Sequence, residues 1–479
     1  MNRRMIVYSL GLLLLLEGIL MLFPSLVAFI YRENILKYYL ATAIVLVAIG
    51  LLLRCVKTKD RMIFSREGLI TVALGWIVMS LFGAIPFTLS GEFPTYVDAF
   101  FEMVSGFTTT GATVLSDVEA LSHASLFWRC FSHWIGGMGV LVFVIATVKL
   151  ASGGGNIYLL RAESSGSEVS KLVPSSKGTA KILYIIYVSM SAAEFIILLF
   201  CGMDAFESIT MTFANAGTGG FGIYNDSFAS FSVAAQIVVA VFMALFGVNF
   251  GCYYLIIVRR FKEFFKNEEL RVYVIIMLAA SVAIAINIVN MCSSVGEAFR
   301  GAFFQVSSVM TSTGFSTMDF NLWPEFSRII MMVVMCIGAC GGSTGGGLKV
   351  SRFILLGKIA IREIRRVAKP NAVSTVRFNG KTVSESMVNN ISSYFILYVI
   401  VIIVSIVLIS FNGLDTVSNV TGVITCVNNI GPGLGDVGPS GNFGSYSLFS
   451  KLVFSLDMLF GRLELFPLFV LFSPRTWRK

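Results

Sequence analysis

Long apolar stretches, separated by short polar connections, run along almost the whole chain. A helix needs about 20 predominantly apolar residues to cross the hydrocarbon of a bilayer. The stretches therefore predict ten membrane spans, at roughly 5–30, 38–54, 68–90, 126–148, 181–202, 232–258, 272–292, 327–358, 391–411 and 446–472. The first predicted span follows Met-Asn-Arg-Arg, as the apolar part of a signal peptide would. No cleavage site of small residues comes after it, so we expect a helix that is retained in the protein.

The charges in the connections favour one orientation. Most of the 36 Lys and Arg residues fall on one side if both termini are cytoplasmic, and cytoplasmic loops carry such an excess. The basic stretches on this cytoplasmic side are 54–67, 149–181, 259–271 and 349–381. The other side is richer in acids, which include Asp98 and Glu102, than in bases, which include Arg129 and Lys451. An acidic outer vestibule would concentrate cations, although such charges are equally typical of solvated loops.

The external connections after the third, fifth, seventh and ninth spans share one pattern. Each holds a semi-apolar stretch too short to span, and each then runs into a Gly-rich segment with Thr, Ser or Asn. The short stretches are 96–107, 204–214, 297–310 and 415–427, and the Gly-rich segments are 108–112, 217–221, 311–315 and 428–432. The unit of helix, re-entrant segment and helix thus occurs four times, and an internal repeat of this kind defines a fold.

The short stretches are expected to be half-helices that enter from outside. Each begins with an acid, namely Asp98, Asp204, Glu297 or Asp415, and an acid in the first turn favours a helix start. The Gly-rich segment would return as extended chain, which is tolerated at membrane depth only where it lines a protected or watery cavity. The sequence therefore predicts an all-α polytopic membrane protein. Its four helix–pore-loop–helix repeats surround one pore in a pseudo-fourfold arrangement, and two extra N-terminal transmembrane helices precede them.

A pore of this kind suits a cation. A dehydrating cation needs replacement oxygens, and backbone carbonyls supply them without a full charge that would trap the ion. Glycine permits positive φ, so successive carbonyls can point the same way. Thr110, Thr313 and Asn429 can add side-chain oxygens nearby.

Composition narrows the possible classes. The 479 residues are 56% hydrophobic and only 13% charged, with a mean hydropathy of +0.83, whereas a soluble domain carries about 25% charged residues. A soluble globule, a disordered chain and a secreted disulfide scaffold are excluded. The net charge of +9 is spread among apolar runs and forms no patch for nucleic acid. The chain has only two histidines, no CxxC motif and no Walker lysine. We therefore expect that it is not an enzyme and that it binds no organic cofactor.

The four segments and the two leading spans resemble the Trk/Ktr/HKT superfamily of K+ uptake proteins over about residues 5–472. Within it the chain is most similar to the Trk-type membrane subunit, because Ktr-type relatives lack the two extra spans. The motifs that carry the resemblance are TTTGAT at 108–113, HWIGGMG at 133–139, TSTGFS at 311–316, GGSTGGG at 341–347, NNIGPGLG at 428–435 and GRLE at 461–464.

The resemblance implies that Gly111, Gly220, Gly314 and Gly431 belong to a selectivity filter. The predicted K+-binding residues are Thr109, Thr110, Gly111, Gly219, Gly220, Thr313, Gly314, Ile430 and Gly431. In this superfamily a serine in place of the first filter glycine tends to accompany Na+ transport, so four glycines favour K+. Two segments depart from the pattern: the second is unusually rich in glycine, and the fourth carries Pro432 where the others have Ala or Phe.

The span 327–358 is interrupted at Cys340–Gly347, where five of eight residues are glycine. Each costs about 1 kcal/mol against alanine in a helix, so we expect a break. A kink or a close helix contact would explain it. The resemblance instead implies a gating loop formed by Gly341, Gly342, Ser343, Thr344, Gly345, Gly346 and Gly347.

Arg462 lies within the last span. A charge there costs at least about 2.5 kcal/mol, so it should face water or a partner such as Glu464 or Asp457. The resemblance implies a place below the filter, beside the gating loop, where the arginine would take part in gating.

The resemblance also implies a location and partners. Trk-type subunits lie in the bacterial inner membrane with both termini cytoplasmic, form homodimers and work with a cytosolic nucleotide-binding ring, the TrkA-type subunit. A basic inner face would also contact anionic lipid. The expected divisions are 1–60 for the N-terminal helices and 61–165, 166–262, 263–372 (with the Gly-rich loop 340–347) and 373–479 for the pore repeats.

The expected function is K+ uptake through a Gly-lined carbonyl filter, gated by the intramembrane loop and a cytosolic regulatory subunit. One alternative is a Na+- or H+-coupled cation symporter, which would also use discontinuous helices but usually has two inverted halves. A second is a polytopic membrane enzyme that acts on lipid, which would need converging polar catalytic groups.

Overall fold

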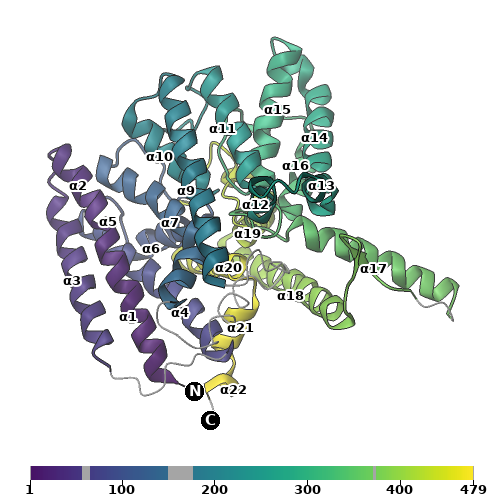
Figure 1. Ribbon diagram of the computed structural model, residues 1–479. Helices are drawn as coiled ribbons and strands as arrows, with labels where there is room; N and C mark the ends of the chain where they lie inside the picture. Colours follow the sequence, from purple (N-terminus) through teal and green to yellow (C-terminus); the bar gives the residue numbers. More distant parts are fainter. Residues whose placement is uncertain (1, 57–64, 149–175, 371–373, 478–479) are drawn as a thin grey trace.

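The computed structural model describes residues 2–56, 65–148, 176–370 and 374–477, almost entirely as helices (Figure 1). Of the basic stretches, 57–64 and 149–175 lie outside these residues. The expected divisions at 60/61, 165/166 and 372/373 also lie outside the described residues. The remaining one, at 262/263, falls in α13 (Phe261–Lys266).

Two N-terminal spans lie at one edge of the molecule (Figure 1). Helix α1 (Arg3–Leu20) continues into α2 (Leu22–Ile30), and α3 (Leu36–Arg54) returns beside them. Glycines allow the backbones to approach, since a Cβ added to Gly50 would lie 2.8 Å from the Leu15 nitrogen and one added to Gly18 would lie 2.9 Å from the Ala43 oxygen. Small residues at helix contacts are typical of membrane proteins.

Four repeats follow, each with a first helix, a short helix and a second helix. The first repeat contains α4 (Ser65–Gly83) with α5 (Ile85–Leu89), α6 (Tyr96–Phe107) and α7 (His123–Val148). The second contains α9 (Ser176–Phe200), α10 (Ala205–Ala216), and α11 (Val233–Phe246) with α12 (Phe250–Ile257). The third contains α14 (Glu268–Ile288), α15 (Val295–Met310), and α16 (Glu325–Ile337) with α17 (Val350–Ala368). The fourth contains α18 (Glu385–Ile409), α19 (Thr416–Asn428), and α20 (Leu448–Arg462) with α21 (Phe466–Phe472).

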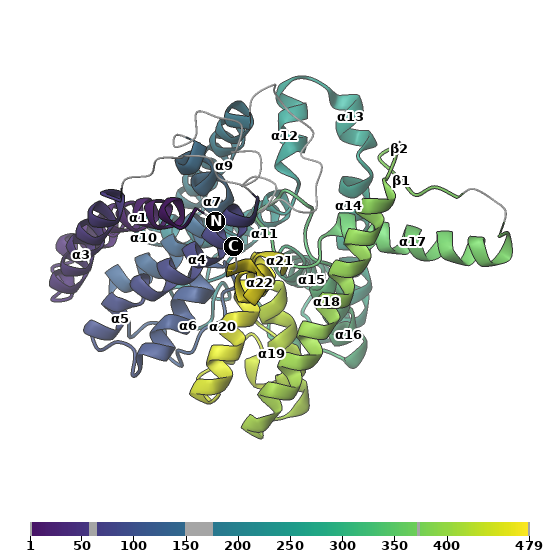
Figure 2. The same cartoon turned by 90° about the horizontal axis from the view of Figure 1, so that it is seen from below.

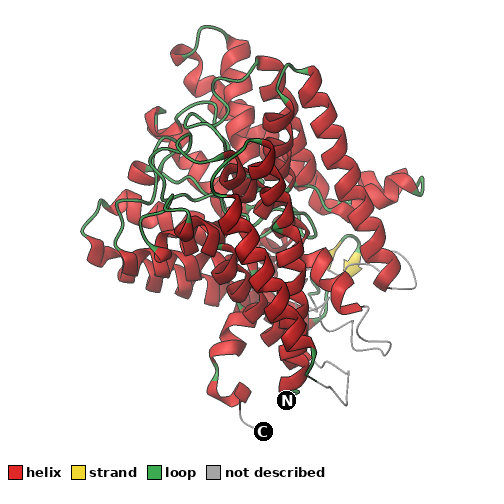
Figure 3. Cartoon of the chain, turned by 90° about the vertical axis from the view of Figure 1, so that its left-hand side faces the viewer, coloured by secondary structure: helices red, strands yellow, loops and turns green. Residues whose placement is uncertain are grey.

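Short elements connect these helices. They are the 3-10 turns η1 (Val289–Met291), η2 (Phe320–Leu322), η3 (Ser410–Asn412) and η4 (Gly435–Val437), the strands β1 (Arg377–Phe378) and β2 (Lys381–Thr382), and the terminal α22 (Pro474–Trp477). The two strands pair antiparallel and are the only strands among the described residues (Figure 3).

The short helices begin where the acids predict. A side-chain oxygen caps each N-terminus, from Thr95, Asp204, Ser294 or Asp415. Such caps satisfy backbone N–H groups that have no partner within the helix. Each short helix ends directly before its Gly-rich segment, so the partly negative C-terminal ends converge on these segments.

Three second helices are broken, of which one break was expected. The break between α16 and α17 covers residues 338–349, which is wider than the expected 340–347. The predictions of continuous helices over 232–258 and 446–472 are wrong. Helices α11 and α12 meet at 91°, and α20 gives way to α21 through Glu464 and Leu465, both with positive φ. Only six helices of the described chain are long and apolar enough to span alone, and the bent pair makes a seventh.

The repeats follow one another around a common centre, and α17 projects outward from the body (Figure 2). Both chain ends lie on the same side of the molecule (Figures 1 and 3). The predicted fold class, four helix–pore-loop–helix repeats preceded by two extra helices, is confirmed.

Candidate functional site

The four Gly-rich loops share one backbone conformation despite different sequences. Each has one non-glycine residue at positive φ, namely Thr109 (56°), Thr218 (55°), Ser312 (59°) or Asn429 (53°). Two residues later each has a glycine at positive φ, namely Gly111 (81°), Gly220 (78°), Gly314 (83°) or Gly431 (96°). The residue between them donates its N–H to the carbonyl five residues earlier at 2.8–2.9 Å in every loop. The glycine-rich second loop and the Pro432-containing fourth loop therefore keep the register of the others.

The four glycines close a ring. A Cβ on Gly111 would overlap the carbonyl oxygen of Gly219, one on Gly220 that of Thr313, and one on Gly314 that of Ile430. A Cβ on Gly431 would lie 2.7 Å from the carbonyl oxygen of Thr110, which returns to the first loop. Each glycine thus faces the carbonyl of the residue before the glycine of the next loop. The geometry gathers eight of the nine predicted ion-binding residues into one ring.

The side chains of these loops bond to one another. The Thr110 hydroxyl lies 2.8 Å from that of Thr108, and the Thr313 hydroxyl lies 2.8 Å from that of Thr311. The Asn429 amide donates to the Thr110 hydroxyl (3.0 Å) and to the Met458 carbonyl (2.8 Å). The ninth predicted residue, Thr109, accepts a hydrogen bond from Arg462 at its hydroxyl (3.1 Å).

The loop between α16 and α17 is held by the first helix of its own repeat and by the second repeat. The buried Glu269 carboxylate, in the first turn of α14, accepts from the N–H groups of Gly341 (2.7 Å) and Ser351 (3.1 Å). The Gly342 carbonyl accepts from Phe250 N–H, and Cys340 donates to the Gly247 carbonyl, both at 3.0 Å. The breaks in the second and third repeats therefore bond to each other.

The centre of this loop lies against the inner ends of two ring loops. Gly346 N–H donates to the Ser312 hydroxyl at 2.5 Å. A Cβ on Gly346 would overlap the Asn428 carbonyl oxygen, and one on Gly345 would lie 2.7 Å from the Thr311 carbonyl oxygen. Only glycine fits these two contacts.

Arg462 connects three parts of the structure. Its guanidinium donates to the Thr109 hydroxyl (3.1 Å), to the Thr344 carbonyl (2.9 Å) and to the Gly136 carbonyl of α7 (2.6 Å). Of the suggested counter-ions, Glu464 forms an ion pair with Arg352, and Asp457 accepts from the Ser405 hydroxyl (2.6 Å). Arg462 thus lies between the first ring loop and the intramembrane loop, at the end of α20.

Four charges expected in an outer vestibule are instead buried in pairs. Glu102 pairs with Arg129 at 2.8 Å, and Asp98 pairs with Lys451 at 2.7 Å. The prediction that they face out is wrong, because their side chains are no more than 7% exposed. A buried charge persists where a partner and hydrogen bonds satisfy it, and Glu102 also accepts from Thr113 and from the Val114 N–H.

Sequence reasoning missed Ser312 and Glu269. Ser312 occupies the same place as Thr109, Thr218 and Asn429, so an alignment of the four repeats would have found it. Glu269 has no sequence signal, since it is one of two acids at the start of an apolar helix.

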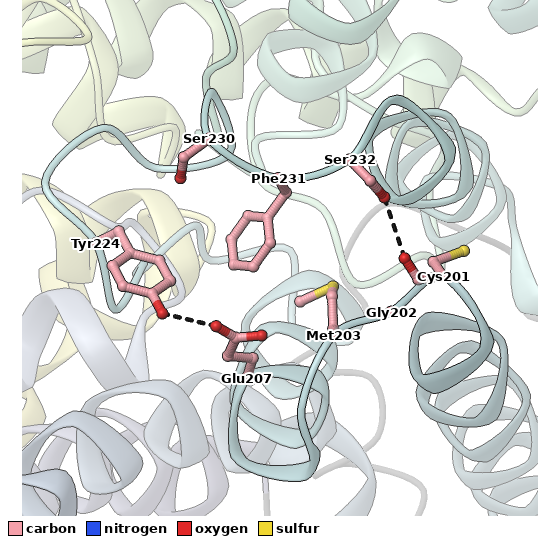
Figure 4. A pocket seen from close by; sticks show the side chains of 8 residues that line it. All are labelled: Cys201, Gly202, Met203, Glu207, Tyr224, Ser230, Phe231 and Ser232. Carbon is pink, nitrogen blue, oxygen red and sulfur yellow. Dashed lines mark hydrogen bonds between the residues drawn. The ribbon is translucent and has the colours of Figure 1, made fainter.

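A pocket of about 320 Å³ lies apart from the ring, between the end of α9 and the start of α10 (Figure 4). It is lined by Cys201, Gly202, Met203, Glu207, Tyr224, Ser230, Phe231 and Ser232. A 2.6 Å hydrogen bond from Tyr224 to Glu207 raises the pKa of Tyr224 to about 12. No group of three His, Cys, Asp or Glu side chains that could hold a metal occurs within the described ranges.

Membrane helices arranged in four repeats around a ring of re-entrant loops define a polytopic membrane transport protein. The model of the family TrkH, "Cation transport protein", matches residues 35–479. The chain belongs to this family. Since its members are transport proteins, the expectation that the chain is not an enzyme is confirmed, and a lipid-modifying enzyme is excluded.

Relatives match along the whole chain. The chain is 38% identical to the Trk system potassium uptake protein TrkH of Escherichia coli K12, with full coverage of both chains. It is 32% identical to the potassium uptake protein TrkG of the same organism, over 99% of each chain. The crystal structure of the potassium transporter TrkH from Vibrio parahaemolyticus is similar with a TM-score of 0.89 and 33% identity, and each chain is fully covered.

Proposed function

We propose that this chain takes up K+ across the bacterial inner membrane through the ring of the four Gly-rich loops. Its relatives along the full chain are potassium uptake proteins, which supports K+ as the cargo. The observation that carries the proposal is the closed succession of four glycines, each against a carbonyl of the next loop.

The ring acts as the selectivity filter. Carbonyls of Thr110, Gly219, Thr313 and Ile430 replace the water shell of K+, and the glycines leave no side chain between neighbouring loops. Four helix C-termini directed at the ring add negative potential without a formal charge. Selectivity then depends on the spacing of the loops, since a smaller cation needs closer oxygens than a rigid ring offers.

The intramembrane loop Gly341–Gly347 and Arg462 form the gate. Gly345 and Gly346 lie against the inner ends of the third and fourth ring loops, and the Arg462 guanidinium bonds both to the first ring loop and to Thr344. A fixed positive charge beneath the filter repels a cation that leaves it. Opening therefore requires the loop and Arg462 to separate from the ring.

Regulation comes from outside the chain. We propose a homodimer whose cytoplasmic face, with both termini, binds a nucleotide-binding ring of the TrkA type and anionic lipid. The basic stretch 349–381 is part of this face. We also propose that the N-terminal helices and the four pore repeats are divided at 60/61, 165/166, 262/263 and 372/373.

Isotope uptake into liposomes that contain the purified chain tests the proposal. We expect 86Rb+ or 42K+ uptake that follows the imposed K+ gradient and is inhibited by unlabelled K+ far more than by Na+. Uptake that depends on a Na+ or H+ gradient would instead establish the symporter. Equal inhibition by K+ and Na+ would contradict the assignment of the filter.

A further inference from the structure

Among the described residues, the backbone of the second ring loop receives no side-chain hydrogen bond from its own short helix, whereas the other three loops do; Glu207 of α10 reaches only the Tyr224 hydroxyl of this loop (2.6 Å). In the first repeat Glu102 of α6 accepts from the Val114 N–H (3.1 Å). In the third, Ser308 of α15 donates to the Phe315 carbonyl (2.6 Å). In the fourth, Thr421 of α19 bonds both backbone groups of Leu434 at 3.0 Å. In each case the short helix holds the segment of its own loop that follows the ring glycine.

Helix α10 makes no such bond to the backbone of its own loop. Thr210 stands ten residues before Gly220, as Thr421 stands before Gly431, but its hydroxyl donates within α10, to the Phe206 carbonyl (2.6 Å). Two other matching positions have no polar side chain. Met211 stands nine residues before Gly220, as Glu102 stands before Gly111, and Ala214 stands six residues before it, as Ser308 stands before Gly314. The paired hydroxyls of the first and third loops are also missing, because Gly217 and Gly219 replace the threonines.

A polar strip on α7 of the first repeat takes this place. Arg129 donates to the Gly222 carbonyl (3.3 Å), and the Cys130 thiol donates to the Phe221 carbonyl (3.4 Å). One turn further along α7, the fully buried His133 accepts the Phe221 N–H at its Nε2 (3.2 Å). Three side chains from one helix thus hold two consecutive residues after the second ring glycine.

The partners of His133 define its protonation. Its Nδ1 lies 2.8 Å from the Gly106 carbonyl, which can only accept, while the Phe221 N–H at Nε2 can only donate. The ring is therefore the neutral imidazole with its proton on Nδ1. In this form it ties the last turn of α6 to the second ring loop.

The imidazole also fills the space of a missing side chain. A Cβ added to Gly219 would overlap the His133 ring, and its three nearest atoms all belong to that ring. The matching positions of the other loops carry Thr110, Thr313 and Ile430. The glycine at 219 and the histidine at 133 are thus complementary in volume.

We infer that His133 is a positioning residue that determines the ion specificity of the second loop, in place of the loop's own side chains. This inference rests on the proposed filter. It predicts that selectivity depends on a residue of α7 that contributes no oxygen to the ring.

An exchange of the two side chains tests the inference in the full-length protein. His133→Ala, Gly219→Thr and the double variant are reconstituted in liposomes, and the K+/Na+ permeability ratio is measured from reversal potentials. Each single variant is expected to lower the ratio about tenfold, because His133→Ala leaves a gap beside the second loop and Gly219→Thr overlaps the imidazole and displaces the loop. The double variant is expected to regain most of it, because the introduced threonine side chain would fill the space left by the imidazole, as Thr110 and Thr313 do in their loops.

Two further variants separate the hydrogen bond from the volume. His133→Gln keeps an acceptor for the Phe221 N–H and should lose less selectivity than His133→Ala. His123→Ala, at an exposed histidine of the same helix with 47% side-chain exposure, should leave the ratio unchanged. If His133→Ala fails to fold, the K+/Na+ permeability ratios of Gly219→Thr and of the double variant are compared instead, and the double variant is expected to have the higher ratio.

The outcomes distinguish the inference from the proposed filter. Gly111→Ser serves as the reference for the filter itself. If Gly111→Ser lowers the ratio and the folded His133→Ala and Gly219→Thr variants do not, the inference is overturned and the filter stands. A double variant no better than the worse single variant also overturns it. An unchanged ratio in Gly111→Ser overturns both.

Discussion

The ring of Gly-rich loops and the intramembrane loop beneath it are built in opposite ways. The ring repeats one backbone conformation four times, and its neighbours meet through glycines and carbonyls. The intramembrane loop occurs in one repeat, and single side chains such as Glu269, Ser312 and Arg462 hold it. This difference agrees with the proposed roles: a filter whose geometry stays constant would be fixed by the main chain, whereas a gate that moves would be held by bonds that can be exchanged one at a time.

The second helices of the four repeats also differ, since three are broken and one is continuous. The breaks contact one another, because the Cys340 N–H donates to the Gly247 carbonyl and Arg462 donates to the Thr344 carbonyl. Helix α7 alone continues without a break, and its Gly136 carbonyl accepts from Arg462. The unbroken helix therefore supports Arg462, and through it the first ring loop and the intramembrane loop.

The largest effect is expected from the buried ion pair behind the ring. Arg129→Met leaves Glu102 as an uncompensated buried charge, which costs about 3–5 kcal/mol of stability. Thermal unfolding in detergent should show a strongly lowered Tm. Arg328→Met is the matched control, because its partner Glu325 is 72% exposed and such pairs contribute at most about 1 kcal/mol. Equal Tm shifts would show that the ring's surroundings are as loosely held as the surface.

The next effect concerns the ring itself. Gly111→Ser places a Cβ on the Gly219 carbonyl oxygen at a φ of 81°, so the second loop must shift. We expect the K+/Na+ permeability ratio to fall about tenfold or more, as for a change above about 1.4 kcal/mol in relative ion binding. Gly91→Ser has the same backbone strain (φ 78°) with nothing within 4 Å, and it should keep the ratio. A ratio retained in both would place selectivity elsewhere.

A smaller effect is expected from the intramembrane loop. Deletion of Gly345–Gly347 removes the bond to Ser312 and the contacts with Thr311 and Asn428. The closed state should lose about 1 kcal/mol, which raises basal K+ flux about fivefold while the K+/Na+ ratio stays the same. Gly357→Ala in α17, which has open space around it, should change neither quantity. A low flux after the deletion, with folded protein, would mean that this loop is not the gate.

The smallest effect is expected at the anchor of the loop. Glu269→Gln keeps an acceptor for the Gly341 and Ser351 N–H groups but removes the charge that strengthens both bonds. Basal flux should rise about twofold to threefold, as for a loss of about 0.5 kcal/mol. The neighbouring Glu268→Gln, which releases only Lys358 and nearby surface contacts, should leave the flux at its original level. A larger response at Glu268 would show that the surface, and not the anchor, controls the loop.

Much of the molecule could be predicted from the sequence because the responsible forces are local. Apolar runs long enough to cross the hydrocarbon predicted the six helices that span alone, and the acids at the N-cap or in the first turn of each half-helix marked its start. The four glycines were found because a positive φ at a fixed distance from a helix end leaves few other residues. The break near Cys340–Gly347 was expected for the same reason, since helix propensity is a property of the segment.

What the tertiary structure alone decided depends on partners far apart in the chain. The apolar sequence around Gly247 permits a continuous helix, and the bend arises because Gly247 and Phe250 bond to the loop of another repeat. Glu102 and Asp98 look like loop acids until Arg129 and Lys451 neutralise them in the interior. His133 matters only because a loop 88 residues away in sequence has no side chain of its own at that place. Local sequence fixes which conformations a segment can adopt, whereas the satisfaction of buried polar groups is settled only when the repeats meet.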